Sequence, residues 1–109
     1  MAGIGEYEFI VDRKTNRVRL FGTQGKYSLV HDAETYQLWR KEAEHYYTGQ
    51  GKSFLYSPVE YWIMKIMRVE GNVFVARCVK CVAPGQNYRK VIQELIEEME
   101  SLPDDNEVP

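Results

Sequence analysis

The sequence lacks any apolar run long enough to cross a membrane, and it has only two cysteines. A membrane-spanning helix needs about 20 consecutive apolar residues, and no stretch of this chain approaches that length. The first residues carry neither a basic start nor an apolar run, so we expect no signal peptide. No asparagine begins a glycosylation acceptor. These absences predict a cytoplasmic protein in a reducing compartment, with no membrane among its partners.

The sequence also lacks a convincing catalytic, cofactor or nucleotide motif. Gly51-Lys52-Ser53 matches the end of a phosphate-binding loop, but that motif needs a glycine where Tyr46 stands and a strand before the loop. His31 and His45 have no Ser or Cys nucleophile with an evident helper near them in the sequence. We therefore assign no catalytic residue and no cofactor. A catalytic site that is assembled only in three dimensions stays open.

Cys78 and Cys81 have the spacing of half a zinc site. Zinc needs four ligands, and only His31 and His45 remain as soft candidates. The two cysteines fall in a predicted strand, where residues three apart point to opposite faces. We therefore predict two small buried residues and no metal site.

What the sequence has is an uneven charge distribution. The chain of 109 residues is 44% hydrophobic and 28% charged, which is typical of one globular domain. Seven of its 16 acids lie in residues 94–109, where there is no Lys or Arg. Residues 1–93 therefore hold nine acids against all 14 bases, a formal charge of +5 against −7 for the C-terminal stretch.

Alternation of apolar and polar residues predicts strands in the first third of the chain. Glu6–Asp12 and Arg17–Phe21 each alternate, and the polar break between them predicts a hairpin. Two glycines follow in a predicted turn, and Lys26–Val30 is a candidate third strand. Val73–Val82 carries the strongest strand signal, and its largely apolar faces predict a central position in the sheet.

A helix is predicted over Ala33–Thr48. Asp32 is a suitable N-cap, and Glu34 in the first turn favours the positive end of the helix dipole. The stripe with helical spacing consists of Tyr36, Trp39, Ala43, Tyr46 and Tyr47.

Ser57–Glu70 fits two structures. Ser57, Pro58 and Glu60 have the arrangement of a capped helix start, and an apolar stripe follows at helical spacing. The alternative is a strand rich in β-formers that pairs with Val73–Val82 through a turn. Because such a strand would have no polar face and would need cover on both sides, we favour the helix.

The C-terminal helix begins near Asn87 and ends near Leu102. Its apolar stripe consists of Tyr88, Val91, Ile92, Leu95, Ile96, Met99 and Leu102. Together these elements predict a single α+β domain over residues 1–102, with an antiparallel sheet of about 3–5 strands packed by two or three helices. Residues 103–109 form an acidic tail.

The first functional hypothesis is a non-catalytic protein-binding module, such as an adaptor, assembly factor or inhibitor. The C-terminal helix has bases in its first turn and acids in its last, the reverse of what the helix dipole favours. An acidic edge would steer a partner with a basic surface. The predicted contacts are Glu97, Glu98, Met99, Glu100, Asp104 and Asp105. Acids that only keep the protein soluble are the alternative explanation.

The second hypothesis is a single-stranded nucleic-acid-binding domain with an autoinhibitory acidic tail. Bases interleaved with aromatic strand residues can form a stacking platform beside a phosphate track. The predicted contacts are Arg13, Lys14, Arg17, Arg19, Phe21, Arg77 and Lys80. The strand aromatics, which include Phe9 and Phe74, are core residues in the competing interpretation, and a pI near 5.7 is low for this class. The sequence leaves a homodimer open.

Overall fold

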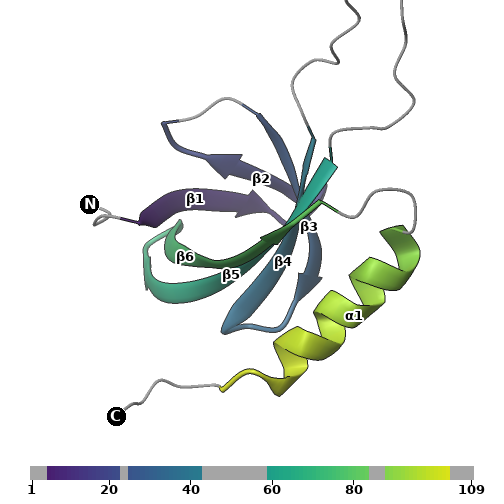
Figure 1. The fold of residues 1–109 in the computed structure, drawn as a ribbon. Helices are drawn as coiled ribbons and strands as arrows, with labels where there is room; N and C mark the ends of the chain where they lie inside the picture. Colours follow the sequence, from purple (N-terminus) through teal and green to yellow (C-terminus); the bar gives the residue numbers. More distant parts are fainter. Residues whose placement is uncertain (1–4, 23–24, 43–58, 84–87, 104–109) are drawn as a thin grey trace, which may run out of the picture.

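The computed structural model is a closed barrel of six antiparallel strands with one helix packed against its side (Figure 1). It describes residues 5–22, 25–42, 59–83 and 88–103. The strands are β1 (Glu6–Asp12), β2 (Arg17–Leu20), β3 (Lys26–Asp32), β4 (Tyr36–Glu42), β5 (Val59–Glu70) and β6 (Val73–Val82), and the helix is α1 (Tyr88–Ser101). Each strand pairs with its neighbours in sequence, and β1 pairs with β6 to close the barrel.

The predicted α+β domain with two or three helices is wrong. The strands expected near the N-terminus, the strand Val73–Val82 and the C-terminal helix are all present. However, the described residues of the other two predicted helices form strands, apart from a turn at residues 33–35, and α1 is the single helix in the part of the chain that the structure describes. The expected helix start at Asn87 lies just outside the described residues.

The predicted helix over Ala33–Thr48 is replaced by β4 as far as Glu42, and its remaining residues lie outside the described part. Asp32 does accept a hydrogen bond from a following backbone N–H, that of Glu34 at 3.0 Å. That bond holds a tight turn, because Glu34 takes a φ of 71° and Ala33 N donates to the carbonyl oxygen of Tyr36 at 2.9 Å. An N-cap and a turn of this kind use the same side-chain chemistry, so Asp32 could not distinguish them.

The favoured helix over Ser57–Glu70 is also wrong, and the strand alternative holds from Val59 onward; residues 57 and 58 lie outside the described part. β5 pairs with β4 through seven register positions and with β6 through nine. Its four central residues are all buried: Tyr61, Trp62, Ile63 and Met64. The strand therefore has the cover on both faces that the sequence could not reveal.

The inner cover of β5 is the barrel core, a set of side chains that point into the barrel. Its buried members are Phe9, Val18, Leu20, Tyr27, Trp39, Trp62, Met64 and Ala76. The rings of Phe9 and Trp39 meet edge to face at 4.5 Å, an arrangement that aromatic pairs favour. Trp39 Nε1 donates a 3.0 Å hydrogen bond to Oε1 of Gln37, whose side chain is also buried. Aromatic rings thus fill most of the interior.

The outer cover of β5 is α1, which packs on the outside of β4 and β5. The buried members of this outer core are Tyr36, Leu38, Tyr61, Ile63, Leu95 and Met99. Tyr36 also donates a 2.8 Å hydrogen bond to the carbonyl oxygen of Pro103, which fixes the chain beyond the helix. No helix among the described residues has the length and apolar character needed to cross a membrane.

Candidate functional site

The outer side of β2 carries three exposed side chains in a row. Val18 and Leu20 point into the barrel core, so Arg17 and Arg19 point outward. Phe21 continues the row, because its backbone N–H donates a 2.9 Å hydrogen bond to the carbonyl oxygen of Glu8 on β1. The side chain of Phe21 is 42% exposed. Alternate residues of a strand are about 6.6 Å apart. We call Arg17, Arg19 and Phe21 the β2 row.

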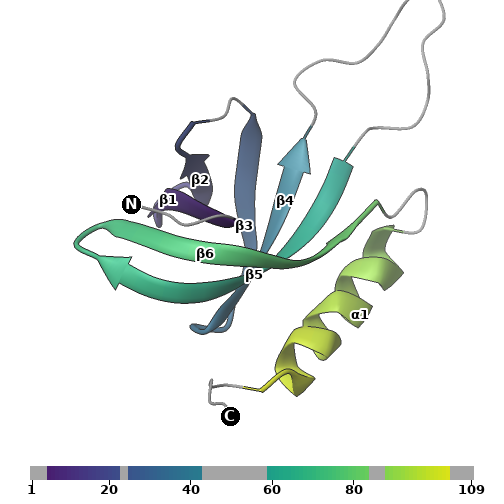
Figure 2. The same cartoon turned by 60° about the vertical axis from the view of Figure 1, so that its left-hand side comes forward.

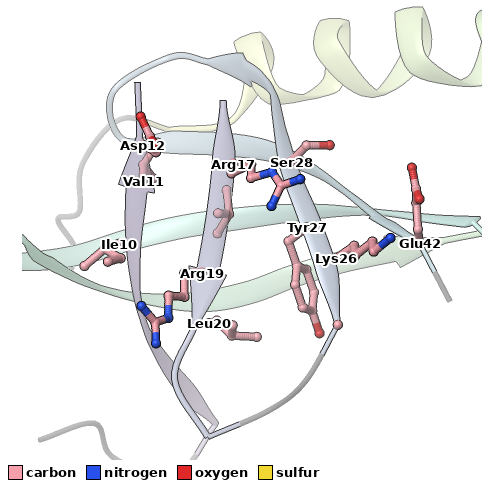
Figure 3. A pocket seen from close by; sticks show the side chains of 12 residues that line it. Ile10, Val11, Asp12, Arg17, Arg19, Leu20, Lys26, Tyr27, Ser28 and Glu42 are labelled. Carbon is pink, nitrogen blue, oxygen red and sulfur yellow. The ribbon is translucent and has the colours of Figure 1, made fainter. Parts of the chain in front are cut away.

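Arg17 and Arg19 of the β2 row line an open hollow of about 800 Å³ beside β2 and β3 (Figure 3). We call it the β2–β3 hollow. It is lined by Ile10, Val11, Asp12, Arg17, Val18, Arg19, Leu20, Gly25, Lys26, Tyr27, Ser28 and Glu42. Its volume is within the range of small-molecule sites, which is about 300–1,000 Å³.

The cations at this hollow are not used elsewhere in the described structure. Neither Arg17 nor Arg19 makes an ion pair or a side-chain hydrogen bond with a described residue, and the same holds for Lys26. The two carboxylates that line the hollow, in contrast, already have partners. Asp12 accepts the backbone N–H of Lys14 at 2.9 Å, and Glu42 pairs with Arg40 at 2.8 Å. The hollow therefore presents three cations that are available to an anion.

Two further bases of the predicted nucleic-acid surface lie in the turn between β1 and β2. Lys14 is exposed in that turn, three residues before Arg17. Arg13 instead forms an ion pair and a hydrogen bond with Asp32. Burial disfavours the charged form of Asp32, but hydrogen bonds from Arg13 and from the Glu34 backbone outweigh it and hold the pKa of that carboxyl below its usual value. Arg13 therefore has a structural partner.

The last two bases of that predicted surface lie on β6, away from the β2 row. Arg77 faces Glu6 of β1, with 3.7 Å between Nη2 and Oε2. Lys80 pairs with Glu98 of α1 at 2.8 Å. The structure thus brings Arg17, Arg19 and Phe21 together in one row, and Lys14 lies in the turn that precedes it. Arg13, Arg77 and Lys80 are instead paired with Asp32, Glu6 and Glu98.

The strand aromatics divide between core and surface. Phe9 is fully buried and stacks on the half-buried Phe74 at 5.1 Å, both inside the barrel. These two rings are core residues, as the competing interpretation of the sequence held. Phe21 is the strand aromatic that stands exposed beside the arginines.

The predicted acidic surface is reduced by packing. Met99 is 2% exposed and belongs to the outer core, so a partner cannot reach it without displacing the helix. Glu98 is occupied by Lys80. Glu97 and Glu100 are exposed, while Asp104 and Asp105 lie outside the described residues. The helix has no acid in its first turn and no base in its last, so its charge order opposes the dipole as the sequence indicated.

The acids of α1 lie far from the β2 row. The helix packs on β4 and β5, and in both views it is on the side of the barrel away from β2 (Figures 1 and 2). Packed sheets are about 10 Å apart, and the helix lies beyond the far wall. Because the Debye length at physiological salt is about 8 Å, the helix acids are largely screened from the β2 row.

The two cysteines do not point to opposite faces, contrary to the prediction. A β-bulge at Val79 changes the register, so that Cys78 pairs with Met64 and Cys81 pairs with Trp62. Met64 and Trp62 both point into the barrel, and therefore so do both cysteines. Neither is fully buried, since Cys78 is half-buried and Cys81 is exposed near the end of the strand. A bulge adds a residue that spacing rules cannot foresee.

The environment of the thiols suppresses their ionisation. Cys81 Sγ lies 3.5 Å from Oε1 of Glu60, which also accepts the indole N–H of Trp62 at 3.0 Å. Partial burial of the thiol and the adjacent Glu60 carboxylate raise the pKa of Cys81 to about 11. Burial also raises the pKa of Cys78. Among the described residues no group of three or more His, Cys, Asp or Glu could hold a metal ion.

Sequence reasoning missed the part of the site that β3 supplies. Lys26 and Tyr27 line the hollow, and Gly25 lies against Tyr27. The usable signal in the sequence was the predicted turn before Lys26–Val30, because two strands joined by a short turn pair with each other and Lys26 then lies on the strand beside the arginines. Comparison with family models, with curated proteins and with solved structures finds no match for this chain.

Proposed function

We propose that this chain is a non-catalytic, cytoplasmic binding module that takes single-stranded nucleic acid along the β2 row. The observation that carries the proposal is the grouping of Arg17 and Arg19, which have no partner among the described residues, with the exposed ring of Phe21. Guanidinium groups bind phosphates in bidentate fashion, and an exposed aromatic ring stacks on a base of any sequence. Both groups are needed by a protein that holds an unpaired strand without reading its sequence.

The overall charge limits the affinity that this surface can give. The formal net charge is −2, and most nucleic-acid-binding domains are strongly basic. The charge layout offsets part of this, because the acids of α1 are on the far side of the barrel. We therefore expect weak binding that is readily detected only at low salt.

The test is fluorescence anisotropy with a labelled oligothymidylate of about twelve nucleotides, measured over a range of salt concentrations. The double variant Arg17→Ala/Arg19→Ala removes two phosphate contacts, so we expect weaker binding and a salt slope smaller by about 1.4. The matched control is Arg77→Ala/Lys80→Ala, which removes the same charge from residues engaged in ion pairs.

Equal losses from the two double variants would mean that net charge alone governs binding, and the β2 row would then have no special role. If the wild-type protein binds no oligonucleotide at low salt, the proposed function is wrong. A truncated chain that ends at Leu102 tests the predicted autoinhibition in the same assay, since removing an inhibitory tail raises the affinity.

The second candidate function is recognition of a basic protein partner by the exposed acids of α1. The observation that favours it is the charge order of the helix, which costs about 0.3–1 kcal/mol per misplaced charge and is not relieved by a base in the last turn. Glu97→Lys should release such a partner in a pull-down, whereas Glu34→Lys, in the exposed turn before β4, should retain it. Retention of every partner by Glu97→Lys and by Glu97→Lys/Glu100→Lys would exclude the acidic face.

A further inference from the structure

Two thiols and one thioether lie on the same face of the ladder between β5 and β6. The bulge at Val79 places Cys78 directly opposite Met64. Cys81 lies opposite Trp62, two residues from Met64 on β5, and both of these β5 side chains belong to the barrel core. Opposed side chains have Cβ atoms about 4.5–5.5 Å apart, and alternate positions of a strand are about 6.6 Å apart. The three side chains Cys78, Cys81 and Met64 are therefore neighbours, and we call them the sulfur cluster.

The sulfur cluster runs from solvent into the barrel. Cys81 is exposed near the end of β6, Cys78 is half-buried, and Met64 is fully buried. Cys78 packs against the barrel core, and its Sγ makes only a weak hydrogen bond, at 3.5 Å, to the carbonyl oxygen of Lys80. An ion can therefore enter at Cys81 and be held against the apolar interior.

The composition of the cluster decides which ion it fits. Structural zinc sites need four ligands, and the described residues contain no group of three His, Cys, Asp or Glu that could hold a metal. Thiolate and thioether ligands are soft and select Cu(I). Because Cu(I) has a filled d shell, two or three sulfur atoms are enough to coordinate it. The spacing of the two cysteines argued against a shared ion only on the ground that they point to opposite faces, and the bulge removes that ground.

We propose that Cys78, Cys81 and Met64 bind one Cu(I) ion. Both thiols release their protons to solvent when the ion binds, so one positive and two negative charges leave a single negative charge on the site. The carboxylate of Glu60, 3.5 Å from Cys81 Sγ, opposes this charge. The ammonium group of Lys41, 5.2 Å from the centre of the Trp62 ring, offsets it. The site is separate from the β2 row and does not depend on the proposed function.

The experiment is an anaerobic titration of the full-length protein into Cu(I) held by the coloured chelator bicinchoninate. Loss of the colour should show transfer of one Cu(I) per chain. The double variant Cys78→Ser/Cys81→Ser should lose this transfer. The same titration with Zn(II) and a coloured zinc chelator should show no transfer, because the cluster offers zinc too few ligands.

A second variant tests the thioether. Met64→Leu nearly conserves the core volume and removes the sulfur, so Cu(I) binding should weaken by about tenfold. X-ray absorption at the copper edge should show three sulfur neighbours in the wild type and two in this variant. Met67→Leu is the matched control, because Met67 lies on the same strand and is 40% exposed, and it should bind as the wild type does.

NMR of the wild-type protein keeps the test decisive if a variant does not fold. Cu(I) is diamagnetic, so the Met64 methyl signal should shift on binding and remain observable, while the Met67 methyl signal should stay in place. Undiminished Cu(I) transfer to the double cysteine variant would overturn the site. Transfer of one Zn(II) per chain that the double cysteine variant abolishes would also overturn it, in favour of a zinc site. An unmoved Met64 signal would overturn the three-sulfur site.

Discussion

Lys80 on β6 donates a hydrogen bond to Glu98 on α1, with 2.8 Å between Nζ and Oε1. The sequence placed Lys80 on a candidate nucleic-acid surface and Glu98 on a candidate protein-binding surface. In the folded chain each residue neutralises the other, and the pair joins the last strand to the helix. Two of the charges that gave the sequence a basic body and an acidic C-terminal stretch therefore pair with each other within the fold.

We predict that the Lys80–Glu98 pair contributes little to stability. The two side chains are 44% and 40% exposed, and exposed pairs contribute about 0.2–1 kcal/mol. A double-mutant cycle with Lys80→Ala and Glu98→Gln, followed by urea unfolding, should give a coupling energy in that range that falls as salt is added. A coupling that is insensitive to salt would show that the pair is less exposed than the structure indicates.

We predict that Leu95→Ala weakens the docking of α1. Leu95 is 3% exposed in the outer core, and removing a buried leucine side chain costs about 2–5 kcal/mol of unfolding free energy. Glu97→Ala, on the exposed side of the same helix, should change stability by no more than about 0.5 kcal/mol. Similar losses in both variants, measured by urea unfolding, would contradict the observed face of the helix.

We predict that the contribution of the buried Gln37 to the free energy of unfolding depends on the presence of Trp39. Gln37→Leu leaves the indole N–H of Trp39 without its acceptor inside the barrel, which costs about 1–3 kcal/mol. In a Trp39→Phe background, which has no indole N–H, the same substitution at Gln37 should cost less. Thermal unfolding of the wild type, the two single variants and the double variant measures this coupling. Strictly additive losses of stability would show that the two residues are not coupled.

We predict slow alkylation of Cys81 at neutral pH. The thiolate is the reactive form, and the pKa of Cys81 is raised to about 11, above the usual value of about 8.5 for a free thiol. Modification by iodoacetamide, followed by mass spectrometry of each cysteine, should accelerate about tenfold per pH unit up to that pKa. Glu60→Gln removes the adjacent negative charge and should therefore shift the rate profile to lower pH.

The same pKa shift has a consequence for stability with a defined sign. Because the pKa is higher in the folded protein, the unfolded chain loses the Cys81 proton first as the pH rises. The contribution of this thiol to the free energy of unfolding is therefore complete below about pH 8.5 and is lost as the pH approaches 11. Cys81→Ser should flatten the stability profile over that alkaline range.

The elements that the sequence predicted well are those with one covered face. β1 and α1 each have a core side and a solvent side, so their periods of two and about 3.6 residues are visible. β4 and β5 lie between the barrel core and α1, and four consecutive residues of each are buried. A strand that is covered on both faces shows no alternation, and its large apolar residues then fit a helical stripe as well as a strand.

The candidate site was predictable only in part for a related reason. Arg17, Arg19 and Phe21 alternate with core residues on one strand, so their common side follows from sequence alone. The third strand was expected, but its pairing with β2 over only two positions was not, and so the placement of Lys26 and Tyr27 beside the arginines was not foreseen. The partners of Arg77 and Lys80 likewise come from elements distant in the sequence.

The pairing of β1 with β6 sets the order in which this chain can fold. Phe9 lies opposite Phe74, so the ring of strands cannot close until nearly the whole barrel sequence has been synthesised. Until then β1 and the last completed strand are open edges, which pair readily with edges of other copies. Contacts that span so much of the chain also slow folding. We therefore expect the protein to fold slowly. We also expect aggregation to be most pronounced on the ribosome or during refolding by dilution, before β1 has paired with β6.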